Sequence, residues 1–410
     1  MITSSGRGAF TYNDASLKSA NKSASGFTGD SMADLLLGMP YTSSVGTTAG
    51  TVYLNFRSDH LFVQDDWKLT PSLTLNLGLR WEMDQPVYSP HNTVSEFNID
   101  TGTFAQAGPT FTHLYNFDWN NFAPRIGFSW QPLKKESTVI KGGFGEFYNA
   151  PLLYNQFLNT GTQYPLRLVP TYTSKVTVPS NESLANPFPS GSIPFYGIGP
   201  GNVQYTNGTT CAASLSPLSI NPNYRTPYIT EWSLGVQQAI GKSLVFETMY
   251  FGSKGTRLPL SINLNQINVN NLAVGAATTQ AMRPFPNFST VNTQDTRANS
   301  QFHSWQNSLK KSYSHGLTFT LAYTWGKSID GGGGIGSGSN SSGASQNIYN
   351  LRAERAVSDF NVARRLIFSP VAQLPFGKGH AMLNSRLAVR WLVDGSYRAS
   401  SSSRPDVRSP

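Results

Sequence analysis

Alternation of apolar and polar positions is the main feature of the stretch "LTLNLGLRWE", residues 73–82. Every second residue is apolar, and the residues between them include Arg80 and Glu82. A period of two predicts a β-strand with one apolar and one polar face. In a soluble β-sandwich the leucines would fill a core. In a membrane barrel they would face lipid, and Arg80 would face a watery lumen.

The same alternation recurs along most of the chain and predicts about ten strands. These are expected at residues 55–69, 73–84, 122–132, 138–148, 228–240, 244–254, 300–310, 317–328 and 364–374, with a weaker one at 389–399. A tilted strand of about ten residues is long enough to cross the hydrocarbon of a membrane. Sandwich strands are usually shorter, about five or six residues. The pattern therefore favours a membrane barrel, with a soluble all-β fold as the alternative.

Short and long connectors alternate strictly between these strands. The short ones are at 70–72, 133–137, 241–243, 311–316 and 375–379, and the long ones at about 85–121, 149–227, 255–299 and 329–363. Alternate connectors of an antiparallel sheet lie at the same end. One end of the predicted sheet therefore has the short turns, and the other end has the long loops. Long structureless loops are uncommon in compact soluble domains. Short periplasmic turns opposite long extracellular loops are the layout of outer-membrane barrels.

The two faces of the predicted strands differ in chemistry. Four charged residues are expected to face the lumen: Arg80, Arg125, Glu231 and Glu247. They could line a solute path, or they could form ion pairs that stiffen the wall, and the second interpretation is favoured. Aromatic residues near the strand ends are candidates for an interfacial girdle: Trp67, Trp81, Trp130, Trp232, Trp325 and Tyr323, with Trp305 and Tyr148 beside them.

Composition agrees with a strand-rich chain. Charged residues make up only 13% of the 410 residues, and hydrophobic residues 39%. The chain has no apolar run of about eighteen residues, which is the length that would predict a transmembrane helix. The single cysteine, Cys211, cannot form an internal disulfide. The net charge of +9 is scattered, and its densest cluster is at residues 352–365, so nucleic acid is not an expected partner.

Candidate sites for chemistry are few. The six histidines are far apart in the sequence and predict no metal site: His60, His91, His113, His303, His315 and His380. The glycine motif that begins at Gly331 lies in a Ser/Gly run and predicts an exposed loop rather than a nucleotide site. Asp65 and Asp66 would point to opposite faces of a strand and cannot act as a catalytic pair. We expect neither an enzyme nor a cofactor.

Several segments resemble the barrel strands of TonB-dependent receptors of the Oar-like type. They are "SMADLLLGMP" (31–40), "FVQDDWKLTPSLTLNLGLRWE" (62–82), "APRIGFSW" (123–130), "VIKGGFGEFY" (139–148), "YITEWSLGVQQAI" (228–240), "LVFETMYFGSKGTRL" (244–258), "SWQNSLKKSYSHGLTFTLAYTWGKSID" (304–330) and "ERAVSDFNVARRLIFSPVAQLPFGKG" (354–379). The similarity runs in order over roughly residues 26–380, and several distinct motifs in sequence make it specific.

This resemblance implies an all-β, antiparallel up-and-down transmembrane barrel in the bacterial outer membrane, with about ten strands of a larger barrel of the 22-strand type. In the family a plug domain and a TonB box precede the barrel and couple it to the TonB complex. Neither part is visible in the sequence, and the start has no signal-peptide pattern. We therefore expect a fragment: a lead-in segment from the upstream barrel region at 1–54, a partial barrel at 55–400 and a disordered tail at 401–410.

Two positions depart from the family pattern. Glu146 stands where an apolar residue is usual, and Pro370 stands inside a strand, where it removes a hydrogen-bond donor. The last 20 residues also fit the family poorly and could come from a shifted reading frame.

The expected function is that of a receptor barrel, which supplies the channel wall and loops that capture a solute of unknown identity. Its expected partners are outer-membrane lipid, lipopolysaccharide and, through the missing N-terminal part, the TonB complex. A structural or secretion-linked outer-membrane barrel without active transport shares all these features. A secreted soluble β-protein that binds glycans through its aromatics is a third alternative.

Overall fold

The computed structural model describes most of the predicted strands and part of each long loop. The described residues are 8–12, 22–23, 26–27, 31–36, 38, 40, 42–48, 51–108, 111–133, 137–150, 157, 160, 163, 166–168, 171–173, 201–203, 216–268, 278–314, 316–331, 345–373, 392–394 and 397–401. Within these residues, no helix has the length and apolarity needed to cross a membrane.

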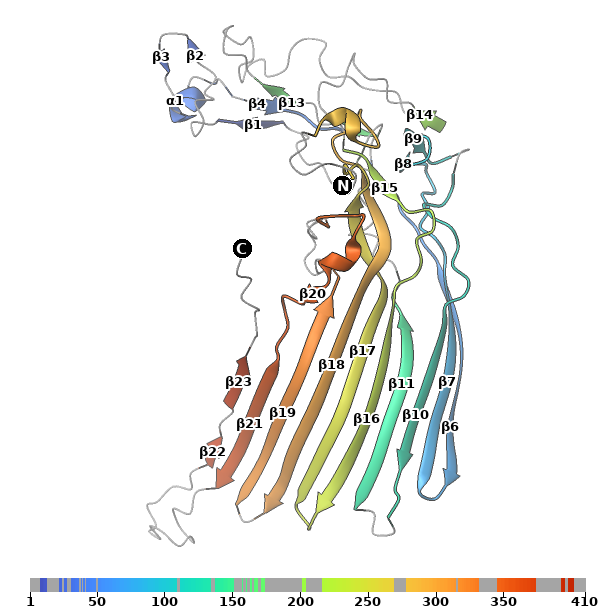
Figure 1. Cartoon of the computed structure of the whole chain (residues 1–410), viewed down its shortest axis with the longest axis vertical. Coiled ribbons are helices and arrows are strands. Elements are labelled where there is room, and N and C mark those ends of the chain that lie inside the picture. Colours follow the sequence, from blue (N-terminus) through green and yellow to red (C-terminus); the bar gives the residue numbers. More distant parts are fainter. Residues whose placement is uncertain are drawn as a thin grey trace.

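A 13-stranded sheet dominates the fold (Figure 1). Its main path, in chain order, consists of β6 (Ser58–Thr70), β7 (Leu73–Asp84), β10 (Phe122–Trp130), β11 (Thr138–Tyr148), β16 (Tyr228–Ile240), β17 (Leu244–Asn263), β18 (Asn292–Ser314), β19 (Leu317–Asp330), β21 (Arg364–Gln373) and β22 (Leu392–Asp394). Each strand pairs antiparallel with the next one along this path. Figure 1 shows them as one curved, tilted wall, which confirms the predicted all-β meander.

Three short strands join this sheet away from the main path. β15 (Leu218–Ile220) pairs parallel with β18, β20 (Ala356–Val357) pairs with β19, and β23 (Tyr397–Ser401) pairs with β21. The strand predicted at 389–399 is thus divided into β22 and β23. On this side of β21 the pairing skips residues 369–370. The gap falls at Pro370, which has no N–H to donate.

The strand edges of this wall do not pair with each other in the described residues. The strand order runs from β6 at one edge to β22 at the other, and closure into a barrel is not seen in this part of the chain.

The tight turns have the backbone conformations expected of hairpins. Gly241, between β16 and β17, has a φ of 62°, and Gly316, between β18 and β19, has a φ of 76°. Glycine adopts such positive φ values without a steric penalty, so these residues allow the chain to reverse within a few residues. The turn predicted at 375–379 lies outside the described residues.

β17 and β18 reach further than the sequence pattern predicted. They extend to Asn263 and back to Asn292, so the segment 255–299 is not all loop. Their register shifts between Gly255 and Leu260, next to Arg257, whose φ is 56°. Such bulges interrupt the alternation and bend the strands. This explains why a period-two search stopped short of the true strand ends.

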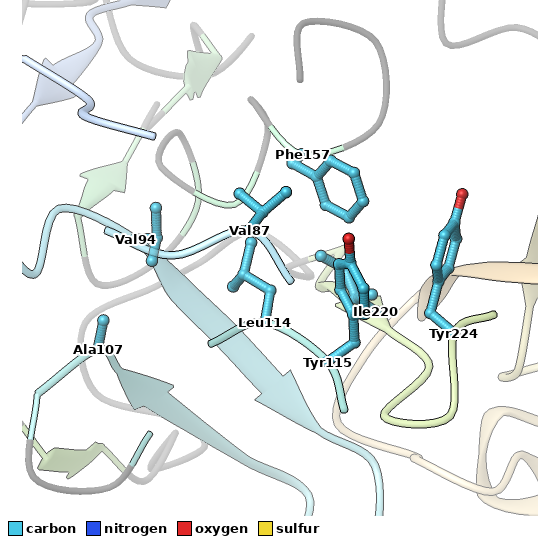
Figure 2. Close-up of a cluster of buried hydrophobic side chains, with 8 residues drawn as sticks. All are labelled: Val87, Val94, Ala107, Leu114, Tyr115, Phe157, Ile220 and Tyr224. Atoms are coloured by element: carbon cyan, nitrogen blue, oxygen red, sulfur yellow. The ribbon is translucent and has the colours of Figure 1, made fainter. Parts of the chain in front are cut away.

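The apolar cores of the described residues lie in the loop assembly, not in the wall. The first core packs residues of three loop segments (Figure 2): Val87, Val94, Ala107, Leu114, Tyr115, Phe157, Ile220 and Tyr224. A second core joins β8 (Ser95–Asn98) and β9 (Thr103–Gln106) to Phe288 and Val291. A third holds the extensions of β17 and β18. The loops are therefore stabilised like a small soluble domain.

The remaining short elements belong to the same loop end. The lead-in segment contributes β1 (Ala9–Thr11), β2 (Lys22–Ser23), β3 (Gly26–Phe27), α1 (Ser31–Leu36), β4 (Thr42–Ser44) and β5 (Thr47–Thr48). β1 and β4 form a sheet with β13 (Thr171–Thr173), β5 pairs with β12 (Arg167–Leu168), and β14 (Gly201–Val203) pairs with β9. The described residues also include 3₁₀ turns at Gln280–Met282 and Leu351–Glu354. Among the described strands of residues 1–54, β4 and β5 thus pair with the long loop 149–227, β1 pairs with β4, β2 pairs with β3, and none joins the large sheet.

Candidate functional site: the polar face of the wall and its rim

Strand register assigns every residue of the wall to one of two faces. Directly paired residues of antiparallel strands lie on the same face. One row of partners consists of Trp67, Leu75, Phe128, Gly142, Leu234, Tyr250, Trp305, Trp325 and Arg364. We call its side the apolar face. Another row consists of Gln64, Gly78, Arg125, Gly145, Glu231, Ser253, Phe302 and Ser328, and it defines the polar face.

The predicted site residues sort by these faces. Arg80, Arg125, Glu231 and Glu247 all lie on the polar face. Trp67, Trp81, Trp130, Trp232, Tyr323 and Trp325 all lie on the apolar face, as do Trp305 and Tyr148. Asp65 and Asp66 lie on different faces of the wall. Asp65 pairs with Leu77 on the apolar face, and Asp66 pairs with Asn76 on the polar face. That the polar face lines a watery lumen stays a prediction.

The apolar face is not covered by a second layer. Leu234 is 55% exposed and Trp325 is also 55% exposed, although both lie in the middle of well-paired strands. A sandwich would bury such residues between its sheets, and a water-soluble surface would not carry so many adjacent apolar side chains. Lipid is the solvent that suits this face.

A hollow of about 430 Å³ lies on the polar face. Arg125 and Glu231 flank it, with Gln64, Asn76 and Ser233 nearby. Its floor is backbone, because four of the lining residues are glycines: Gly78, Gly127, Gly143 and Gly145. The Arg125 guanidinium lies over the Phe147 ring, 4.7 Å from its centroid. The hollow thus presents a cation, a carboxylate and open backbone on one surface.

The charged residues of the polar face take two different roles. Glu247 forms an ion pair with Lys141 across the intervening strand β16. Lys141 Nζ lies 2.6 Å from Glu247 Oε1. This pair supports the stiffening role that the sequence analysis favoured. Glu231 has no ion pair or hydrogen bond to another described residue. It is therefore the better candidate for contact with a solute.

The loop end of the β6–β7 hairpin holds a buried charged network that sequence spacing did not reveal. His60 Nε2 lies 3.3 Å from Asp84 Oδ1, and Arg80 Nε lies 3.1 Å from Glu82 Oε1. Ser58 donates to Asp84 at 2.5 Å, and the Asp84 side chain is only 1% exposed. Pairing across the two strands brings these residues together, since His60 lies opposite Glu82 and Ser58 opposite Asp84.

His60, Glu82 and Asp84 are close enough to be considered as metal ligands. However, Arg80 already supplies a cation to this group, because its Nη2 donates to His60 Nδ1. Arginine stays protonated, so Nδ1 is the acceptor and Nε2 carries the ring proton that is donated to Asp84. A metal at Nε2 would have to displace this proton and the bond to Asp84 while Arg80 keeps its place at Nδ1. We therefore interpret the group as an ion-pair network that holds the rim of the hairpin.

A second ion pair, whose carboxylate is buried, joins the loops at the top of the wall. Asp118 accepts a hydrogen bond from Arg225 Nε at 2.6 Å and from the Thr226 backbone N–H at 3.2 Å. Asn121 is fully buried and donates to Thr226 Oγ1 at 3.1 Å. These bonds join the chain just before β10 to the chain just before β16, so the two loops cannot move independently.

Glu96 makes the packing of the loops sensitive to pH. Its Oε1 accepts a hydrogen bond from the Ile220 backbone N–H at 3.3 Å. Burial raises the pKa of Glu96 from 4.5 to about 8. A raised carboxyl pKa gives stability that is present at low pH and is lost as the pH rises through the folded value. The contact between β8 and β15 should therefore weaken as the pH rises from about 4.5 to about 8.

We expect amide hydrogen exchange in residues 216–220 to accelerate between about pH 5 and pH 8 by more than the intrinsic chemistry explains, and this excess to level off above about pH 8. Glu96→Gln keeps a neutral side chain of the same shape, so in that variant the excess acceleration should disappear. An excess acceleration that persists in Glu96→Gln would show that another group is responsible.

Several of the remaining sequence candidates lie outside the described residues. The glycine motif that begins at Gly331 runs outside the described residues after its first member. His315, His380 and Cys211 also lie outside them. Glu146 lies on the apolar face, two strands from Lys254.

The fold and its exposed apolar face define the wall of a membrane-spanning β-barrel. The sequence matches the family described as "Outer membrane beta barrel domain" over residues 2–401, and the chain belongs to this family. Its place is the bacterial outer membrane, and proteins of this class are typically non-enzymatic. No curated protein matches the chain.

Several solved structures are similar to the chain at low sequence identity. The copper transporter OprC has a TM-score of 0.40 and 11% identity, over 78% of this chain and 33% of its own. YddB, an outer membrane transporter from Escherichia coli, has a TM-score of 0.39 and 11% identity, over 88% and 48%. The siderophore receptor PiuA from Acinetobacter baumannii has a TM-score of 0.38 and 12% identity, over 89% and 38%. The chain spans less than half the length of each.

Proposed function

We propose that this chain forms part of the channel wall of a TonB-dependent outer-membrane transporter, with its long loops as the solute-capturing end. The observation that carries the proposal is the two-faced wall: an uncovered apolar face, and a polar face whose hollow lies between Arg125 and Glu231. The ordered resemblance of residues 26–380 to TonB-dependent receptors supports the same assignment. On this proposal, specificity for the solute depends on the loops and the plug together.

The packing of the loops fits a capture surface. Three apolar clusters and the Asp118–Arg225 pair hold segments from different loops together above the wall. A preorganised surface loses less conformational entropy when a ligand binds than a set of independent loops does. On this proposal a solute binds the loops first. It then passes along the polar face once a plug, supplied by the intact protein, has moved.

A structural or secretion-linked barrel is the rival function, and coupling to TonB separates the two. The test uses the natural protein, extracted in detergent from the outer membrane of its own bacterium. It is passed over the immobilised periplasmic domain of TonB from that bacterium. Active transport predicts retention that soluble TonB domain competes away. Passage without retention, from a sample that still shows a folded β spectrum, would favour the structural role.

A further inference from the structure

The apolar face carries unpaired cations in one region near the loop end. Tyr250, Trp305, Trp325 and Arg364 are successive partners in one register row. His303 and Lys327 are partners in the next row towards the loops. We call these six residues the aromatic–cationic patch. They line a groove of about 760 Å³.

Side-chain contacts fix the aromatic part of this patch. Tyr250 Oη and His303 Nδ1 are 2.7 Å apart, and Trp305 Nε1 donates to Thr248 Oγ1 at 2.8 Å. Trp305 is 49% exposed, so its ring offers a broad apolar surface to the groove. In contrast, neither Lys327 nor Arg364 has an ion pair or side-chain hydrogen bond to another described residue.

The height of the patch along the strands places it at a membrane interface. β19 begins at Leu317, directly after the tight turn, and Trp325 is eight residues further along this strand. A rise of about 3.3 Å per residue and a tilt of about 40° put it roughly 20 Å above the turn end. The apolar band of such barrels is about 25 Å tall. The patch therefore lies at the upper edge of the band, on the side of the long loops, where aromatic and basic residues meet lipid headgroups.

The surface above the patch is also basic. Lys254 lies on the same face, and with Arg297, Arg352 and Arg355 it lines a further hollow of about 400 Å³. Arg297 is paired with Asp295 at 2.7 Å, and Arg355 donates to Gln301. Lys254 and Arg352 have no acidic partner among the described residues. Glu146 is a carboxylate on the same face as Lys254, two strands away.

We propose that the aromatic–cationic patch binds a phosphate of a lipid headgroup in the outer leaflet, which in this membrane is the phosphorylated disaccharide of lipopolysaccharide. Lys327 and Arg364 hold the phosphate oxygens, because charge-assisted hydrogen bonds to phosphate are the strong ones available to these groups. Trp305 and Trp325 lie beside the sugar and the first part of the acyl chains. The proposal concerns the outer surface of the wall and does not depend on which solute is carried.

The test compares two double variants with the same loss of charge. Lys327→Gln with Arg364→Gln removes the cations of the patch. Lys310→Gln with Arg365→Gln removes two cations of the polar face, and Arg365 is the neighbour of Arg364 on the same strand. Each protein is held in a non-ionic detergent and titrated with purified lipid A, and bound lipid is counted by native mass spectrometry. Dephosphorylated lipid A is titrated in the same way for comparison, and inorganic phosphate is added as a competitor.

We expect the patch variant to bind lipid A about tenfold more weakly than the unchanged chain, and the polar-face variant to bind it normally. Dephosphorylated lipid A should bind all three proteins equally weakly. Equal losses in the two variants would mean diffuse charge attraction and would overturn the proposal. So would full competition by millimolar inorganic phosphate, which would indicate a site for free anions. Retention of the β spectrum in each variant shows that the comparison is between folded proteins.

Discussion

Replacing Leu234 by arginine is expected to lower the free energy of unfolding in lipid vesicles by about 2–4 kcal/mol. Leu234 lies on the apolar face of β16, between Gly142 and Tyr250, six residues before the end of the strand at Ile240. This position is close to the middle of the hydrocarbon. A guanidinium there must lose its hydration or draw water and headgroups inwards, and both are costly.

The matched control is Ser233→Arg, one residue away on the polar face. The same charge is added to the same strand, but its side chain points into the hollow beside Arg125 and Glu231. We expect a change below about 1 kcal/mol, typical of a solvated position. Urea titrations of tryptophan fluorescence in phosphatidylcholine vesicles measure both values. Equal costs at the two positions would argue against lipid on the apolar face.

Replacing Gly252 by alanine is expected to cost about 1–3 kcal/mol. The indole of Trp232 lies directly over this glycine, so an added Cβ would be 2.3 Å from Trp232 Cε2. The ring must leave its place, and with it the edge-to-face contact with His303 at 5.9 Å. Gly142 lies beneath Phe128 in the same way, at 2.6 Å. Aromatic rings that cover glycines on a neighbouring strand fix the register of a sheet.

Gly78→Ala is the control, because a Cβ at this position would meet its nearest neighbours at 3.7 Å, an ordinary contact. Its effect on unfolding should stay within about 0.5 kcal/mol. The cost of Gly252→Ala should also largely vanish in a Trp232→Ala background, since the ring that causes the clash is absent. A full cost in that background would assign the effect to the backbone instead of the ring.

Alternation alone predicted nine of the strands and the side on which each charged candidate lies. The strand from Leu73 to Asp84 was predicted with its correct bounds, because its period of two is unbroken. β18 was predicted to start at residue 300 but begins at Asn292, since its upper part is built around bulges and polar residues. Alternation predicts a strand correctly where each face has a single environment along its whole length. It fails where loop residues pack on the strand.

Contacts between distant segments could not be read from the sequence. Nothing in the spacing of His60 and Asp84 shows that the β6–β7 register places them 3.3 Å apart. The Lys141–Glu247 pair depends on the order of three strands. The polar face also carries Phe251 and Phe302, whose rings are 6.2 Å apart, and the sequence analysis did not name either residue.

The central claim is that water meets one face of the wall and lipid the other, and a cysteine scan along β16 tests it most directly. Cys211 is first replaced by serine, and single cysteines are then placed at Ser233, Leu234, Val236 and Gln237. The proteins are inserted in lipid vesicles and treated with a membrane-impermeant maleimide. We predict rapid labelling at 233 and 237 and protection at 234 and 236. Labelling at 234 and 236 as fast as at the other two positions would contradict the claim.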